Sequence, residues 1–507
     1  ILLRVIGVLL SVLQSRQFSL VAKDIAFRIR RDIIANLQKV SMKEYETLGS
    51  GVVASHLVTD VQAIDDFIAI SLSRFVVAVL TIIGIAGILL YMQWQLALFI
   101  LFMNPLVIYF TMVLGKKVKQ LKSEENKAFE VFQQSLNETL NAINQIRTSN
   151  RERHYLKQVL DKARGIKKHS ASYSWRSDAA NRLSFLVFLI GFEVFRAVSM
   201  VLVLFSELTL GQMFAVYAYL WFMMTPVQDI LGVQYSAYSA QAALKRINKL
   251  LQLEHEPEYP SLHDPFKDKE TVSVQLDNLQ FYYDDEKILN GVSLQIEAGE
   301  KVAFVGASGG GKSTLVQVIL GLYQPQHGNV CFDNIAITEI GLDKVRENVA
   351  TVLQHPVLLN ASIRENLSMG LDYADDDIWQ ALEIAQLSDY VQGLEAKLDT
   401  IVGRNGVRLS GGQRQRLAIA RMILSSPKVV ILDEATSALD TETEARLHAA
   451  MRAFLKQRTT IIIAHRLSAV KQADRVFVFD NGQIIDEGHH NDLISREGLY
   501  KKLYAKS

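Results

Sequence analysis

The chain of 507 residues contains a single cysteine, Cys331, and no CxxC pair or Cys/His cluster. One cysteine cannot close an internal disulfide, and the zinc-ligand patterns all need more of these residues. Neither charge sign is in excess, since 54 Lys and Arg face 53 Asp and Glu. The overall charge therefore gives no indication of a nucleic-acid partner. The scarcity of cysteine fits domains that face a reducing compartment.

Proline is also scarce, and three of the eight prolines fall in one short acidic segment, QLEHEPEYPSLHDPFKDKE at 252–270. No helix or strand is expected to run through such a segment. The composition changes on either side of it. The sequence therefore predicts a first domain at 1–250, a linker at 251–271 and a second domain at 272–507.

Charged residues are absent from 75–115, a run about twice the roughly 20 residues that cross a bilayer. MQWQL at 92–96 interrupts it, with a tryptophan typical of a membrane interface, and predicts a tight hairpin between two helices. Further spans are expected at Leu183–Phe205 and Leu208–Gln228, joined by a short turn around Glu207. With the apolar start ILLRVIGVLLSVL, four spans and a fragment of a fifth are predicted.

Lysine and arginine gather in the long segments before and after this first hairpin, and the two short turns contain none. The positive-inside rule therefore places the long segments in the cytoplasm. Residues 116–182 contain no proline and repeat apolar residues at helical spacing, which predicts long helical extensions of the membrane helices. The pattern breaks near 41–51 and 146–153, where short crossing elements are expected.

Within the first domain, Glu193 and Arg196 lie three residues apart inside a predicted span. Charges in a membrane segment are candidates for a functional role. At this spacing they also suit an ion pair along one helix. Both interpretations, contact with a transported molecule and a structural ion pair, remain open from the sequence.

After residue 271, short β-branched runs alternate with helical patterns, which predicts an α/β domain with a largely parallel sheet. GASGGGKST at 306–314 follows one such strand and precedes an apolar helix, and it matches the P-loop pattern at every position. The glycines allow backbone N–H groups to surround nucleotide phosphates, the lysine adds charge, and the first hydroxyl can bind Mg²⁺. The expected nucleotide-contacting residues are Gly306, Ser308, Gly309, Gly311, Lys312, Ser313 and Thr314.

The segment VVILDEATSALD at 429–440 is predicted to form the other side of the metal site. Four apolar residues lead to Asp433 at the end of a strand, where its carboxylate can hold Mg²⁺ through water. The neighbouring Glu434 is suited to polarise the attacking water as a general base.

With these motifs the sequence resembles the ATP-binding cassette (ABC) transporters of the exporter type, in which a membrane domain and an ATP-binding domain are fused. The resemblance covers essentially the whole chain, and LSGGQ at 409–413 is the family signature. It implies nucleotide contacts for Tyr283, which would stack on adenine, and for Ser410, Gly411, Gly412, Gln413 and Asp440. It further implies that Gln354 acts as a metal ligand and in catalysis, and that His465 is the catalytic switch histidine.

The resemblance implies a half-transporter that lacks its first helix and part of its second, and that functions as a dimer. Each ATP would lie between the P-loop of one subunit and the signature of the other. Because both half-sites match the family, a homodimer is expected. ATP-driven efflux with Mg²⁺, in contact with membrane lipid, is the implied function. A lipid flippase and a peptide or protein secretion subunit are the alternatives, and the transported substrate is left undefined.

The resemblance also implies a bacterial inner membrane location with the ATP-binding domain in the cytoplasm. A soluble ABC ATPase is disfavoured by the long uncharged runs. In related exporters the crossing elements meet the region after the Q-loop, here Pro356–Asn366. One departure concerns TIVGRNGVRLSGGQ, where Arg404 replaces the acidic residue common before the signature and reverses a charge near the expected contact with the membrane-domain loops.

Overall fold

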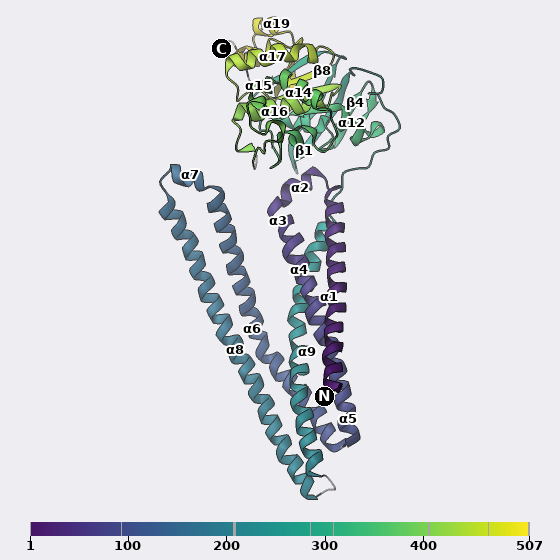
Figure 1. Ribbon diagram of the computed structural model, residues 1–507. Helices are drawn as coiled ribbons and strands as arrows, with labels where there is room; N and C mark the ends of the chain where they lie inside the picture. Colours follow the sequence, from purple (N-terminus) through teal and green to yellow (C-terminus); the bar gives the residue numbers. More distant parts are fainter. Residues whose placement is uncertain are drawn as a thin grey trace. The chain divides into compact units, whose positions relative to one another are not determined.

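Long helices are followed by an α/β region, in the order that the sequence predicts (Figure 1). The computed structural model describes residues 2–92, 94–205, 209–283, 285–307, 309–403, 406–464 and 466–504. Internal contacts divide the chain into two units. The first comprises residues 1–39 and 48–253, and the second comprises residues 40–47 and 254–507. The expected boundaries differ from this division mainly at residues 40–47, which group with the second unit.

The described residues of the first unit form helices joined by short turns. Its long helices α6 and α8 run side by side and are joined by the short α7 (Figure 1). Helix α9 runs along α5. The helices are α1 (Leu2–Leu37), α3 (Ser50–Ser55), η1 (His56–Asp60), α4 (Val61–Asp66), η2 (Phe67–Leu72), α5 (Ser73–Met92), α6 (Trp94–Asn141), α7 (Ile143–Thr148), α8 (Glu152–Phe205) and α9 (Leu210–Leu251).

The helix breaks fall where the sequence predicts them. Helix α6 ends at Asn141 and α8 begins at Glu152, with α7 between them, and α2 (Met42–Leu48) occupies the other predicted crossing segment. Among the described residues, three helical segments are long and apolar enough to cross a membrane, namely Val5–Leu37, Gly51–Met92 and Glu152–Val201. The predicted turn around Glu207 lies outside the described residues.

Charged side chains contribute to the interior of this unit. Asp60 is buried and accepts hydrogen bonds from Nε and Nη2 of Arg246 at 2.9 and 2.5 Å, which joins η1 to α9. Burying a carboxylate is tolerated only when it is paired in this way. On α8, Arg196 forms an ion pair with Glu193 at 3.1 Å, which agrees with the interpretation of these residues as a structural ion pair. A contact with a transported molecule stays a prediction.

The second unit contains two sheets. The larger has the strand order β10-β9-β3-β8-β7-β6, with β9, β3, β8, β7 and β6 parallel and β10 antiparallel at one edge. This confirms the predicted parallel sheet. The strands of the larger sheet are β3 (Lys301–Gly306), β6 (Val349–Val352), β7 (Val429–Asp433), β8 (Thr459–Ile463), β9 (Arg475–Asp480) and β10 (Gln483–Gly488). A four-stranded antiparallel sheet, which the sequence did not predict, is formed by β1 (Val274–Tyr283), β2 (Glu286–Ile296), β4 (His327–Phe332) and β5 (Ile335–Ala336).

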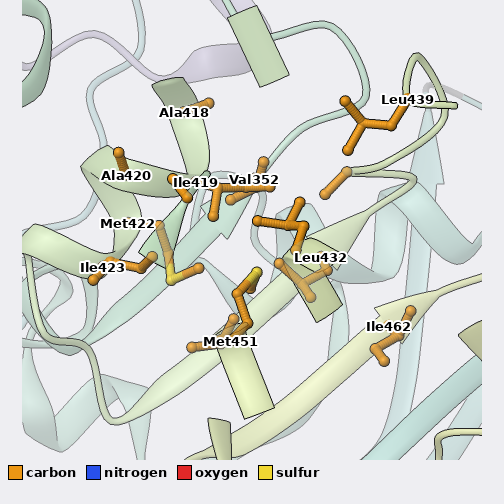
Figure 2. Close-up of a cluster of buried hydrophobic side chains, with 14 of the residues drawn as sticks. Val352, Ala418, Ile419, Ala420, Met422, Ile423, Leu432, Leu439, Met451 and Ile462 are labelled. Carbon is orange, nitrogen blue, oxygen red and sulfur yellow. The ribbon is translucent and has the colours of Figure 1, made fainter. Parts of the chain in front are cut away.

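Helix α16 (Gly411–Leu424) is held by a buried apolar cluster. Figure 2 shows Met422 and Ile423 of this helix in one cluster with Leu432 of β7 and Met451 of α17 (Thr441–Leu455). Side chains from α16, the sheet and α17 thus share one core. Because a core of this kind is close-packed, it fixes the position of the residues at the start of α16.

The predicted linker is an irregular segment that packs on the second unit. Helix α9 ends at Leu251 and β1 begins at Val274, so the proline-rich segment lies between regular elements, as predicted. Its Phe266 is only 3% exposed, and the Glu256 carboxylate accepts two hydrogen bonds from Arg346, both at 2.9 Å. Residues 40–47 join the same unit, because Glu46 accepts a hydrogen bond from the Tyr323 hydroxyl at 2.5 Å.

Candidate functional site

The loop between β3 and α10 (Lys312–Ile319) adopts conformations that favour glycine. Gly309 and Gly311 have φ angles of 80° and 92°, and Gly311 is the N-cap of α10. A Cβ at Gly306 would lie 2.1 Å from the carbonyl oxygen of Phe479, so no larger residue fits there. The loop therefore brings main-chain N–H groups to the start of a helix, which is the arrangement that binds phosphate.

Lys312 is the buried cation of this loop. It is only 5% exposed, and its ammonium donates hydrogen bonds to the carbonyl oxygens of Gly306 and Ala307 at 3.0 and 2.8 Å. Burial lowers the pKa of Lys312, while the charges of Asp433 and Glu434 act in the opposite direction. The side chain is thus held over the loop and within electrostatic reach of both carboxylates. Ser313 and Thr314 follow in the first turn of α10.

The acidic pair and the predicted glutamine come together at the carboxyl edge of the parallel sheet. Asp433 is the last residue of β7, whose other residues are buried, and Glu434 follows with a left-handed φ of 47°. The Gln354 amide, two residues after β6, donates a hydrogen bond to Oε2 of Glu434 at 2.6 Å. Because β6 and β7 are neighbouring parallel strands, two residues 80 positions apart meet at one edge.

Tyr283 is the last residue of β1. Its ring makes edge-to-face contacts with Phe281 and Tyr323, with centroid distances of 4.9 and 5.4 Å. Its hydroxyl donates a hydrogen bond to Oε1 of Gln317 in α10, at 3.3 Å. The ring is therefore fixed relative to the helix that begins at the P-loop, as an aromatic platform for a base would require.

The signature residues form a capped helix start. The Ser410 hydroxyl accepts a hydrogen bond from the Gln413 N–H at 3.2 Å, and the Gln413 side chain accepts one from the Ser410 N–H at 2.7 Å. This reciprocal capping defines the first turn of α16. The N-terminus of a helix of this length carries partial positive charge and attracts anions.

Gly411 and Gly412 lie against the segment that follows Glu434. A Cβ at Gly412 would be 2.8 Å from Cδ2 of Leu439 and 3.2 Å from the Ala438 carbonyl oxygen. A larger residue at Gly412 would have to displace the Leu439 side chain and crowd the Ala438 carbonyl. Asp440, the N-cap of α17, accepts a hydrogen bond from the Thr443 N–H at 2.9 Å, and this bond lowers the pKa of its carboxyl group.

In the ATP-binding domain, three residues singled out in the sequence analysis lie outside the described residues, namely Ser308, Arg404 and His465. Their predicted roles stay predictions.

Gln415 is a residue that the sequence analysis missed. It is 2% exposed, and its amide nitrogen donates to the Ser437 hydroxyl at 3.0 Å, to the Gln354 carbonyl at 3.2 Å and, more weakly, to the Glu434 carbonyl at 3.5 Å. Its amide oxygen accepts from the Ala438 N–H at 3.0 Å. One buried side chain thus joins α16 to the segments after β6 and β7. The second glutamine of LSGGQRQ, a polar residue on the apolar face of its helix, was the available signal.

Replacing Gln415 with leucine should slow ATP hydrolysis about tenfold and leave ATP affinity nearly unchanged. Leucine leaves buried polar groups of the segments after β6 and β7 without a hydrogen-bond partner, and it does not touch the P-loop. Steady-state ATPase and nucleotide-binding measurements on the purified protein test this. The matched control is Gln392→Leu, an exposed glutamine that bonds to Ser388. Equal hydrolysis rates in the two variants would contradict a role for Gln415.

The P-loop, the strand-end acidic pair and the capped Ser-Gly-Gly-Gln helix together define an ATPase domain of the ABC type, preceded here by a helical domain with membrane-spanning windows. Comparison with known proteins agrees. Residues 289–437 match the ABC transporter family, and residues 1–227 match the ABC transporter transmembrane region.

The chain is 33% identical to the uncharacterised ABC transporter ATP-binding protein YwjA of Bacillus subtilis (strain 168), over 94% of this chain and 83% of that protein. It is 31% identical to the multidrug resistance ABC transporter ATP-binding and permease protein of Lactococcus lactis subsp. lactis (strain IL1403), over 92% and 79%. A solved bacterial Atm1-family ABC exporter with ATP bound is similar with a TM-score of 0.87 and 27% identity, over 99% of this chain and 88% of that one.

The chain belongs to the ABC transporter family and is of the exporter type, with fused transmembrane and ATP-binding domains. It is an integral membrane protein that binds ATP and couples ATP hydrolysis to transport.

Proposed function

We propose that two copies of this chain form the working exporter, with each ATP bound between the P-loop of one copy and the signature helix of the other. The observation that carries the proposal is the count of half-sites. One chain supplies one P-loop and one Ser-Gly-Gly-Gln helix start, so two chains supply two complete sites. The γ-phosphate would then face the positive end of α16, and its loss would release the two subunits.

Magnesium fits the chemistry of the proposed site. The Ser313 hydroxyl, the Asp433 carboxylate and the Gln354 amide oxygen are hard oxygen donors, which Mg²⁺ prefers. Bound there, the ion would neutralise charge on the phosphates. In this assignment Glu434 serves as the general base, with Gln354 donating a hydrogen bond to its carboxylate and His465 acting beside it. Tyr283 stacks on adenine, and Ser308, Asp440 and the signature residues contact the phosphates or position the groups that do.

The cargo is proposed from the relatives. Small amphipathic molecules come first, because the Lactococcus lactis protein is named a multidrug resistance transporter. Lipids and peptides are the alternatives. Stimulation of ATPase activity in liposomes by a set of drugs, lipids and peptides tests this order of substrates, and stimulation by peptides alone would contradict it.

The proposed location is a bacterial inner membrane with the ATP-binding domain in the cytoplasm, which fits the basic segments and the bacterial relatives. Coupling of ATP hydrolysis to transport through the crossing elements near 41–51 and 146–153 and through Pro356–Asn366 is part of the same proposal.

Mixing two inactive variants tests the shared site. Lys312→Ala removes the P-loop cation, and Ser410→Arg places a bulky cation at the cap of α16. In a mixed dimer both damaged groups meet in one site and the other site is intact. We expect ATPase activity to return on mixing, to about half the wild-type activity per mixed dimer if one intact site turns over alone.

Tagging the two variants differently and purifying by both tags isolates the mixed dimers and provides the control. Doubly tagged wild type gives the reference rate, and each variant alone gives the background. Recovery in the mixed dimer supports the shared site. Failure of the chain to form any self-dimer would contradict the homodimer and indicate a different partner chain. Absence of recovery in confirmed mixed dimers would instead show that both sites must be intact together.

A further inference from the structure

Three side chains and one main-chain carbonyl form a hydrogen-bonded ring that includes the segment following the acidic pair Asp433 and Glu434. The Glu444 carboxylate accepts a hydrogen bond from the Thr436 hydroxyl at 2.9 Å and another from Nη1 of Arg466 at 2.7 Å. The second terminal nitrogen of Arg466, Nη2, donates to the Ser437 carbonyl at 3.0 Å. Because Thr436 and Ser437 are adjacent, the ring ties the segment that follows Glu434 to the segment that follows β8. It uses both oxygens of the carboxylate and both ends of the guanidinium.

The two segments do not fill the space between them. A cavity of about 90 Å³ is lined by residues from both, including Glu434, Ser437, Ala464 and Arg466. Where side chains interlock, packing holds neighbouring segments in place. The β7–β8 ladder joins the two segments as far as Asp433 and Ile463. Beyond the ladder the space is open, and the polar ring connects the segments across it.

The ring contains a buried carboxylate whose charge has to be balanced. Glu444 is 6% exposed, whereas the Arg466 side chain is 43% exposed. His448 lies near the same carboxylate, with Nε2 at 3.7 Å from Oε1, a distance too long for a hydrogen bond. Burial lowers the pKa of His448, which disfavours its charged form. Arg466 is therefore the cation that balances a buried carboxylate, and removing it leaves that charge uncompensated.

We propose that Arg466 and Glu444 form an internal clamp that positions residues 436–439 relative to Ala464 and Arg466, and that this clamp sets the rate of ATP turnover without contributing to nucleotide binding. The inference rests on the proposed function, because it assumes that Glu434 and His465 act on the same ATP. The clamp residues are positioning residues. Thr436 is two residues from Glu434, and Arg466 is the neighbour of His465 in the chain.

The positions of these two segments matter for catalysis and not for ATP affinity, for a geometric reason. The P-loop groups assigned to phosphate binding lie in the loop after β3 and in the first turn of α10, and the assigned signature residues lie at the start of α16. The hydrogen bonds of the ring involve none of these residues. A small displacement of a catalytic group from its reacting geometry can lower a rate about 100-fold. Loosening the ring should therefore lower kcat while the Kd of ATP stays nearly constant.

Three variants separate positioning from stability. Arg466→Met should lower kcat about 10- to 100-fold, keep the Kd of ATP within about threefold, and lower the thermal unfolding temperature. Arg466→Lys keeps the charge but cannot reach both Glu444 and Ser437, so its kcat should lie between wild type and Arg466→Met. The double variant Arg466→Met with Glu444→Gln removes both charges. It should regain thermal stability while kcat stays low, since the link to Ser437 is still absent.

Hydrogen exchange gives a readout that does not depend on ATPase activity. The amides of Ser437, Ala438 and Leu439 donate hydrogen bonds to the Glu434 carbonyl, the Gln415 side chain and the Thr436 carbonyl, at 3.0, 3.0 and 3.1 Å. Without the clamp this segment should open more often, and exchange at these amides should be at least about tenfold faster in Arg466→Met.

Arg475→Met is the matched control. Arg475 pairs with Glu300 through two hydrogen bonds at 2.8 and 3.0 Å, and it stands at the first residue of β9, the opposite end of the sheet from the acidic pair. This variant should lose thermal stability but keep the wild-type kcat and the wild-type exchange rates at residues 437–439.

Two results would overturn the clamp. The first is unchanged exchange at residues 437–439 in Arg466→Met, whatever the ATPase rate. The second is a double variant whose kcat recovers together with its stability, because charge balance alone would then be sufficient. Failure of the proposed function looks different, since it would appear in the wild-type protein as absent ATPase activity or absent dimers, while the exchange comparison could still be made.

Discussion

Replacing Lys312 with alanine should abolish ATP turnover. The ammonium is buried in the P-loop, donates to two carbonyl oxygens of that loop and lies within electrostatic reach of Asp433 and Glu434. Alanine removes the charge that would oppose the β- and γ-phosphates, and it leaves two loop carbonyls without their donor. We expect the purified variant in detergent or liposomes to hydrolyse ATP at less than about one tenth of the wild-type rate.

A lysine of the strand that precedes the P-loop provides the control. Lys301 is the first residue of β3, so Lys301→Ala makes the same change of charge at the opposite end of the strand from the P-loop. Burial lowers the pKa of Lys301 as well, although this side chain is only half-buried. Lys301→Ala should retain ATPase activity in proportion to the folded protein. A Lys312→Ala variant that kept more than about a tenth of the wild-type activity would contradict the P-loop assignment.

The parts of the site that the sequence predicted are those built from contiguous residues. The P-loop binds through main-chain groups, and its glycine pattern is itself the geometric requirement, as the φ angles of Gly309 and Gly311 show. Ser410 and Gln413 likewise cap a helix through neighbours three residues apart. The position of Asp433 followed from four apolar residues, which could only be a buried strand leading to a polar end.

Contacts between distant residues could not be predicted in this way. Gln415 bonds to a carbonyl 61 positions away in sequence, and Arg466 reaches a carboxylate 22 positions away. Both residues lie in motifs in which the sequence analysis assigned functional roles to their neighbours. Nothing in residue spacing specifies such a pair, because it depends on which strands become neighbours in the sheet.

Strand pairing explains what was missed in the fold. In the antiparallel sheet, β1 pairs with β2 and with β4, and bulges interrupt both registers. An irregular register breaks the alternation of polar and apolar residues that would have revealed these strands. Residues 40–47 show the same limit. A break in the helical pattern and a short crossing element were predicted near 41–51, but the bridge from Val40 to His255 and the bond from Tyr323 to Glu46 depend on tertiary contacts.

Changing Glu434 to glutamine should leave ATP binding intact and trap the two ATP-binding domains in the closed, ATP-bound state. Glutamine keeps the size of the side chain, and its amide oxygen can still accept the hydrogen bond that Gln354 donates at 2.6 Å. The left-handed φ of 47° is equally accessible to both residues, so the backbone after β7 should not change. What is lost is the basic carboxylate, and without a base the γ-phosphate stays bound between the two proposed half-sites.

Spin labels on the ATP-binding domains of two subunits, with distances measured with and without ATP and Mg²⁺, provide the test. The Glu434→Gln protein should show the short distance whenever ATP is present, and its hydrolysis should fall at least about 100-fold. The control is Glu442→Gln, the same chemical change at an exposed glutamate of α17 that pairs with Arg446. That variant should close and reopen through repeated turnovers, as the wild type does. If Glu434→Gln bound ATP and yet remained open, the closing of the domains would not be limited by hydrolysis at this carboxylate, and the base would have to be sought in another residue of the same edge.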